Sequence, residues 1–139
     1  MKYISGIHAL NLRCSLQTCG DWHQSGIQWK MPTVRESSNS LFGDYGIEKN
    51  SYVPEHEGAS NTANHIRACL DLLAEGNFGY AQGVRNELIC NDSYTPEIFK
   101  TVYVLKNLKH WDKISEFMGK DYGLQWLNFL SREKPREKN

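Results

Sequence analysis

The chain has 139 residues, of which 40% are hydrophobic and 23% are charged, and its 16 basic residues balance its 16 acidic ones. This composition is that of a globular domain and excludes wholesale disorder, and the length is enough to bury a core without disulfide or metal cross-links. A net charge of zero argues against nucleic-acid binding, which usually needs a basic excess to neutralise phosphates.

Membrane insertion and secretion are not indicated by the sequence. Residues 1–6 lack the apolar stretch of a secretory signal, and no run approaches the roughly 20 apolar residues that span a bilayer. In this context the four cysteines, Cys14, Cys19, Cys69 and Cys90, favour reduced thiols over a disulfide framework. We therefore expect a soluble cytoplasmic protein with no membrane partner and with four free thiols.

The first part of the chain, residues 1–59, contains short apolar runs separated by glycine, serine and asparagine. Residues 3–12 form the first candidate strand, although Gly6 weakens the pattern. Residues 27–31 alternate apolar and polar side chains, as a half-buried strand does. Residues 37–47 are rich in turn formers, which predicts loops between the strands.

From residue 60 onward, apolar side chains recur at helical spacing. One helix should begin at residues 60–61 and end at Gly76, where a left-handed residue is favoured. Residues 95–97 (Thr-Pro-Glu) are typical of a second helix start. Shorter stripes over residues 111–119 and 124–130 predict two further helices. The predicted core positions are Ile66, Leu70, Leu73, Phe99, Val102 and Leu105.

The pattern predicts an α+β fold, in which an irregular N-terminal half with a few short strands packs on a helical C-terminal half around a single core. We expect one globular domain over residues 1–130 and a charged, frayed tail over residues 131–139. A mostly helical domain with a long N-terminal coil is the competing interpretation.

Residues 14–23 hold the densest set of side chains capable of chemistry. Cys14, Cys19 and His23 could bind a tetrahedral zinc ion, but a second cysteine pair at matching spacing is missing. Cys19 and His23 could also supply a thiolate and a base, which requires a lowered thiol pKa and an orienting third group. Alternatively, the cysteines are buried apolar groups, and Asp21 and His23 hydrogen-bond around a turn. We expect no metal and no cofactor.

Several other polar and aromatic residues have both a functional and a structural interpretation. Arg35 is followed by Glu-Ser, a string that resembles an element of ADP-ribosyltransferase-like folds. The helical second half of the chain instead favours an exposed charged turn at Arg35. His65 and Arg67 could belong to a recognition surface, or His65 could be a boundary residue bonded to a backbone carbonyl. Trp22 and Trp29 would mark a protein interface if they were exposed. The predicted binding residues are Trp22, His23, Trp29, Arg35, His65 and Arg67.

Four short strings carry a resemblance to a known group of proteins. They are YISGIHALNL (residues 3–12), CGDWH (19–23), ANHIRA (63–68) and FMGK (117–120). Together they resemble a family of small bacterial proteins encoded beside nucleotidyltransferase-like toxins of the abortive-infection type. The resemblance implies an antitoxin-like or accessory role in a toxin–antitoxin or phage-defence module, and it assigns no catalytic residues.

We therefore predict a non-enzymatic protein that binds a protein partner, which the resemblance implies is a toxin encoded by the neighbouring gene. Apolar and aromatic side chains would dock on the partner, and loop carboxylates would complement a basic site. The alternative is a small enzyme with a metal- or thiol-dependent site within residues 14–23. An exposed aromatic patch would favour partner binding, and convergence of Cys14, Cys19 and His23 would favour the enzyme.

Overall fold

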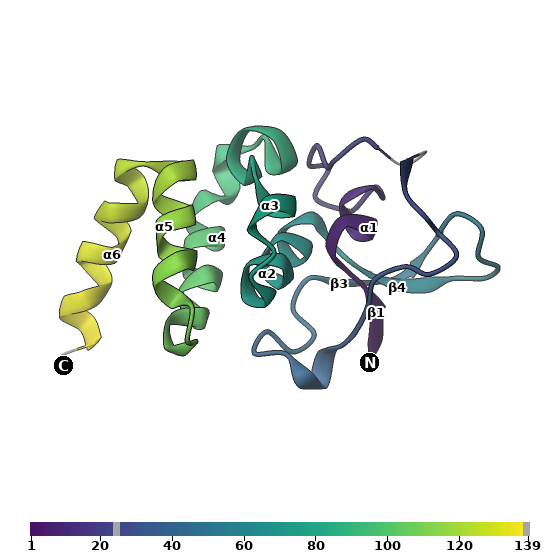
Figure 1. The fold of residues 1–139 in the computed structure, drawn as a ribbon, viewed down its shortest axis with the longest axis horizontal. Coiled ribbons are helices and arrows are strands. Elements are labelled where there is room, and N and C mark those ends of the chain that lie inside the picture. The colour runs from purple at the N-terminus through teal and green to yellow at the C-terminus, as the bar shows by residue number, and fades with distance from the viewer. Residues whose placement is uncertain (24–25, 138–139) are drawn as a thin grey trace.

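Strands lie in the first half of the chain and helices mainly in the second (Figure 1). The computed structural model describes residues 1–23 and 26–137. Its elements, in chain order, are β1 (Lys2–Ile4), α1 (Gly6–Leu10), β2 (Val34–Glu36), η2 (Ser37–Asn39), β3 (Ile47–Ser51), β4 (Ser60–Ala63), α2 (His65–Glu75), α3 (Phe78–Ala81), η3 (Val84–Ile89), η4 (Asp92–Tyr94), α4 (Thr95–Tyr103), η5 (Val104–Asn107), α5 (Trp111–Tyr122) and α6 (Leu124–Glu137). The predicted α+β fold is confirmed.

The strands form one mixed sheet in the order β2-β1-β4-β3. β1 pairs antiparallel with β2 and parallel with β4, and β3 pairs antiparallel with β4. The strand predicted over residues 3–12 ends early, at Ile4. Gly6 has a φ of +59° and begins helix α1 instead. Such a conformation leaves the extended region and is most favourable for glycine, which has no Cβ.

The strand predicted over residues 27–31 does not form, because this segment follows an irregular path. Its alternating pattern has a different cause. Trp29 is 3% exposed and packs with Ile4 and Val53 in a small hydrophobic cluster beside the sheet. One buried indole therefore produces the apolar signal that resembled a half-buried strand.

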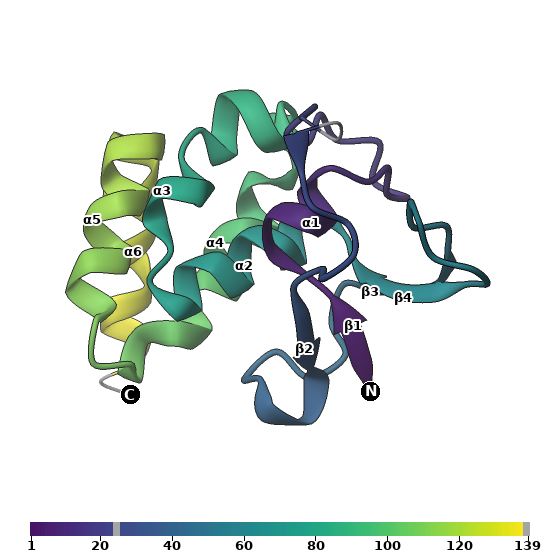
Figure 2. The ribbon, with the colours of Figure 1, turned by 45° about the vertical axis from the view of Figure 1, so that its right-hand side comes forward.

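Helix α2 lies between the sheet and helices α4, α5 and α6 (Figures 1 and 2). Every residue from His65 to Leu73 is buried, as expected for a helix with neighbours on all sides. Its predicted start at residues 60–61 is wrong, because these residues belong to β4. Asn64 caps the helix instead, and its side chain accepts a hydrogen bond from the backbone N–H of Arg67. The helix ends as predicted at Gly76, which has a φ of +79°.

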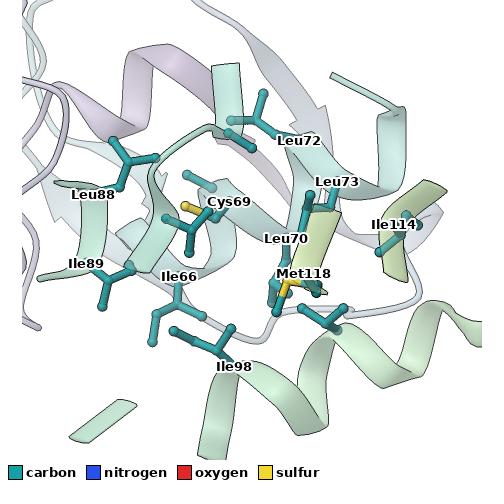
Figure 3. Close-up of a cluster of buried hydrophobic side chains, with 14 of the residues drawn as sticks. Ile66, Cys69, Leu70, Leu72, Leu73, Leu88, Ile89, Ile98, Ile114 and Met118 are labelled. Carbon is teal, nitrogen blue, oxygen red and sulfur yellow. The ribbon is translucent and has the colours of Figure 1, made fainter. Parts of the chain in front are cut away.

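The main hydrophobic core fills the space between α2, η3, α4 and α5 (Figure 3). Each predicted core side chain is at most 4% exposed, which confirms the assigned helix faces; the residues are Ile66, Leu70, Leu73, Phe99, Val102 and Leu105. Burying a side chain of this size stabilises a fold by about 1.5–3 kcal/mol. This packing fixes α2 and thereby the position of its N-terminal end.

The C-terminal helices follow their predicted starts more closely than their predicted ends. α4 begins at Thr95, with proline in its first turn, as predicted. α5 continues past the predicted end at Gly119 and stops at Tyr122, before Gly123, which has a φ of +64°. α6 runs beyond residue 130 to Glu137, into the segment set apart in the sequence as a tail.

A buried polar network ties α2 to strand β1. Arg67 is 0% exposed, and its Nε donates to Oδ1 of Asp71 at 3.0 Å. Oδ2 of Asp71 accepts from the hydroxyls of Tyr3 and Ser5, each at 2.6 Å. Two carbonyls in residues 43–45 accept from Nη1 of Arg67. These partners allow the Arg67 side chain to lie inside the fold, because a buried charge is stable only when it is paired and hydrogen-bonded.

Within the part of the chain that the structure describes, no helix is long and apolar enough to cross a membrane.

Candidate functional site

A cleft of about 760 Å³ lies between the segment 10–22 and the N-terminal end of α2. Its walls include Cys14, Thr18, Cys19 and His65. Two grooves of comparable size run along α4, α5 and α6, and neither is lined by a cysteine or a histidine. Of these three cavities in the described part of the chain, the cleft beside α2 is therefore the one with side chains suited to nucleophilic or acid–base chemistry.

The loop that forms one wall of the cleft has no regular structure and is held by contacts to three other elements. Ser15 donates its backbone N–H and its hydroxyl to the carboxylate of Glu48 in β3. The hydroxyl of Tyr94 in η4 donates to the carbonyl of Leu16 at 3.2 Å. The backbone N–H of Gly20 donates to the carbonyl of Leu88 in η3 at 2.8 Å. These contacts hold Cys14 and its neighbours against α2.

Gly20 allows the loop to approach the ring of His65. Its φ is +76°, and an added Cβ would lie 2.5 Å from the carbonyl oxygen of Leu10 and 2.9 Å from Cε1 of His65. No larger residue fits here without moving the backbone or the imidazole. The glycine thus sets the close packing that keeps His65 2% exposed.

A chain of hydrogen bonds joins Cys14 to His65. Sγ of Cys14 lies 3.5 Å from Oγ1 of Thr18, and this oxygen lies 2.5 Å from Nδ1 of His65. On the other side of the ring, Nε2 lies 2.6 Å from the carbonyl oxygen of Leu12. A carbonyl only accepts, so Nε2 carries a proton, and in the neutral ring Nδ1 accepts from the Thr18 hydroxyl. The Cys14 thiol then donates to the Thr18 oxygen.

The electrostatics of the pair favour a thiolate beside an imidazolium. Burial raises the pKa of the Cys14 thiol, but hydrogen bonds from His65 and Thr18 and the charge of His65 outweigh it, lowering the pKa from 9.0 to about 7. Burial lowers the pKa of His65, but the interactions with Cys14, the Leu12 carbonyl and Glu48 raise it more. The two shifts have one cause, since each charge stabilises the other.

The N-terminal end of α2 contributes to the same effect. The backbone N–H of His65, the first residue of this helix, also lowers the pKa of the Cys14 thiol. Free N–H groups at a helix N-terminus stabilise negative charge and lower thiol pKa values. The other free thiol, that of Cys69, shows the opposite behaviour. It is fully buried in the core, and burial together with the negative charge of Asp121 raises its pKa. Cys14 is therefore the reactive member of the two.

The structure corrects the prediction of four free thiols. Cys19 and Cys90 form a disulfide with a Cα–Cα distance of 6.0 Å, within the usual range. The two residues are 71 positions apart, and packing of the Gly20 backbone against Leu88 of η3 brings them together. The spacing of the cysteines in the sequence does not indicate this contact.

The six predicted binding residues are scattered over the molecule. Trp22 is 73% exposed and lines the cleft with His65. His23 is exposed and its Nδ1 lies 3.1 Å from Oδ1 of Asp21, the turn contact considered from the sequence. Arg35 forms a surface ion pair with a glutamate of α2. Trp29 and Arg67 are buried, as described above.

The sequence interpretation placed the thiolate and its base at Cys19 and His23, but Cys19 is in a disulfide and the free thiol near a histidine is that of Cys14. The imidazole that meets the thiol is that of His65, and Thr18, the residue that bridges them, was not considered. One local signal pointed to this arrangement. Asn64 is a favourable N-cap, and a helix start placed there would have put His65 at a helix N-terminus.

No family model, curated protein or solved structure matches this chain. Among residues 1–23 and 26–137, no group of three or more histidine, cysteine, aspartate or glutamate side chains is placed to hold a metal ion. The absence of zinc stays a prediction.

Proposed function

We propose that this protein is a thiol-dependent enzyme in which Cys14 is the nucleophile and His65 is its general base. The observation that carries the proposal is the hydrogen-bonded chain from Cys14 through Thr18 to His65, with the Leu12 carbonyl orienting the ring, at the wall of an open cleft. A nucleophile, a base within hydrogen-bond reach and a third orienting group form the recurring arrangement of covalent catalysis. This geometry supports the thiol-dependent alternative more strongly than it supports partner binding.

The hydroxyl of Thr18 provides a path for the proton. As the Cys14 thiol gives its proton to Oγ1 of Thr18, the hydroxyl proton passes to Nδ1 of His65. The resulting imidazolium keeps its second N–H bonded to the Leu12 carbonyl, so the ring does not turn. After the thiolate attacks an electrophile in the cleft, the same path returns the proton to the leaving group. General acid–base assistance of this kind typically contributes about 10²–10⁴-fold to a rate.

The test uses an electrophile that reports attack directly, p-nitrophenyl acetate. We expect a burst of about one nitrophenolate per chain, with the acetyl group on Cys14, as covalent catalysis requires. Cys14→Ala should abolish the burst, and His65→Gln should slow it by about 10²–10⁴-fold. The second free thiol, that of Cys69, does not compete for the reagent, because it is buried. A burst rate equal to that of free cysteine at the same pH would refute the proposal.

A second candidate function, the antitoxin-like partner binding that the resemblance implies, is favoured by one observation. Trp22 is 73% exposed at the rim of the cleft, next to the exposed His23. Exposed tryptophans are frequent binding hot spots. If a toxin from the neighbouring gene docks here, Trp22→Ala should weaken the complex by about 2 kcal/mol or more in calorimetry. Cys14→Ala should not. Unchanged affinity of the Trp22 variant would contradict this candidate.

A cytoplasmic location of the protein also stays a prediction.

A further inference from the structure

Two sulfur centres in different oxidation states share one cleft. The free thiol of Cys14 and the disulfide sulfur of Cys19 both belong to its lining. A turn between them brings the chain back on itself, because the backbone N–H of Gln17 donates to the carbonyl of Cys14 at 3.1 Å. The residue next to Cys19, Thr18, touches the Cys14 sulfur at 3.5 Å. A nucleophilic thiol is thus held near a disulfide of its own chain.

Cys90, the second cysteine of the disulfide, is positioned to act as the leaving group. Cys90 follows η3 and is exposed to solvent, whereas Cys19 is partly buried in the cleft wall. Water can therefore solvate and protonate a thiolate released at Cys90. Thiol–disulfide exchange needs a thiolate that attacks and a sulfur that can depart, and Cys14 and Cys90 are the residues that can take these two roles.

We propose that Cys14 exchanges this disulfide within the chain, an inference that rests on the nucleophile of the proposed function. The Cys14 thiolate attacks Sγ of Cys19, a Cys14–Cys19 bond forms, and the Cys19–Cys90 bond breaks. Its electron pair leaves on Cys90, which takes a proton from water, while the proton from Cys14 stays on His65. One disulfide and one thiol are present before and after, so no external oxidant or reductant is needed.

The exchange changes both the chemistry and the tethering of the cleft. A Cys14–Cys19 bond consumes the nucleophile, so the enzyme of the proposed function is switched off. It also removes the covalent link between the loop and η3, leaving the Gly20–Leu88 hydrogen bond as a remaining contact between these segments. Cys90 becomes the free thiol. The chain thus carries its own electrophile for Cys14, the disulfide sulfur of Cys19 in the same cleft.

Trypsin separates the relevant cysteines cleanly. Cleavage after Arg13 and Lys30 places Cys14 and Cys19 on peptide 14–30, and cleavage after Arg85 and Lys100 places Cys90 on peptide 86–100. The oxidised full-length protein, purified without reductant, is incubated with iodoacetamide at a series of pH values from 6 to 10, pH 6 and pH 8 among them, then quenched in acid and digested. Mass spectrometry reports which cysteines carry the label and which peptides stay linked.

We expect labelled Cys90 to accumulate at pH 8 and only slowly at pH 6, at a rate independent of protein concentration. Peptide 14–30 should then appear alone, unlabelled and lighter by the two hydrogens lost in the Cys14–Cys19 bond. In Cys14→Ala, and in Cys14→Ser as a second variant, peptide 86–100 should stay linked to peptide 14–30 at both pH values.

Three outcomes would overturn the inference, and they differ in whether the proposed function remains supported. If Cys14 is labelled with a pH midpoint near 7 while Cys90 stays linked in the wild type, the exchange is absent and the proposed function survives. If the labelling rate of Cys14 rises with pH only around a midpoint near 9, Cys14 is not an activated nucleophile and the proposed function is wrong as well. If Cys19 and Cys90 are both labelled in Cys14→Ala, the disulfide does not form in solution.

Discussion

Replacing Cys90 by serine tests how much the disulfide contributes to the fold. The bond joins residues 71 positions apart, and in the chain-entropy model a loop of this size lowers the free energy of the folded relative to the unfolded state by about 4 kcal/mol. Cys90 is the better position to change, because it is exposed, whereas Cys19 lines the cleft. Since a domain of this kind is stable by about 5–15 kcal/mol, the loss is a large share of the total.

Urea unfolding at 25 °C, followed by circular dichroism, measures the difference. With slopes of about 1–3 kcal/mol per molar urea, the Cys90→Ser midpoint should fall by about 1–4 M. Adding dithiothreitol should bring the wild type down to the variant and leave the variant unchanged. The control is Cys14→Ser, which removes a free thiol without a cross-link and should keep the response to reductant. Equal midpoints for wild type and Cys90→Ser, with or without reductant, would refute the reasoning.

Three other substitutions probe the structure around the site, each by the free energy of unfolding in urea. Gly20→Ala combines a positive φ with an added Cβ 2.5 Å from a carbonyl oxygen, so it should destabilise by more than about 1 kcal/mol; a neutral result would contradict the close approach to His65. Arg67→Met leaves the charge of Asp71 buried without its partner and should cost about 3–5 kcal/mol; a loss below about 1 kcal/mol would mean that the pair is exposed to water. Leu70→Ala should cost about 2–5 kcal/mol, and an unchanged midpoint would contradict the assigned face of α2.

Local signals predicted the helical half of the fold well. The left-handed Gly76 and the Thr-Pro start of α4 act within a few residues, so the sequence alone contains them. The helical stripes also identified the buried faces of α2 and α4. In the first half the same approach was less successful. The buried Trp29 gave residues 27–31 the apolar pattern of a strand, and the strand expected over residues 3–12 ends before Gly6, which begins a helix.

The candidate site could be predicted only in part. The sequence singled out the segment that carries Cys14 and the alternative of a thiolate with a base. It could not show which histidine meets the thiol, because Cys14 and His65 are brought together by the anchoring of a loop on β3 and η3. The disulfide was missed for the same reason, since Cys19 and Cys90 approach through packing of η3 on that loop.

The pH dependence of Cys14 alkylation tests the central claim most directly. In the oxidised protein the free thiols are those of Cys14 and Cys69, and the buried Cys69 serves as an internal unreactive control. Since only the thiolate reacts, the combined rate of alkylation at Cys14 and, through the exchange, at Cys90 should rise with pH around a midpoint of about 7. His65→Gln should move the midpoint to 9.0 or above, because the stabilising partner is lost and burial, which raises the pKa, remains.

Thr18 offers a matched pair of variants for the same measurement. Thr18→Val removes the hydroxyl at nearly constant shape and should raise the midpoint, whereas Thr18→Ser keeps the hydroxyl and should leave it near 7, because the hydroxyl donates to the Cys14 sulfur once that sulfur is a thiolate. A wild-type midpoint at the ordinary thiol value of 9.0, or one that His65→Gln does not move, would contradict the account.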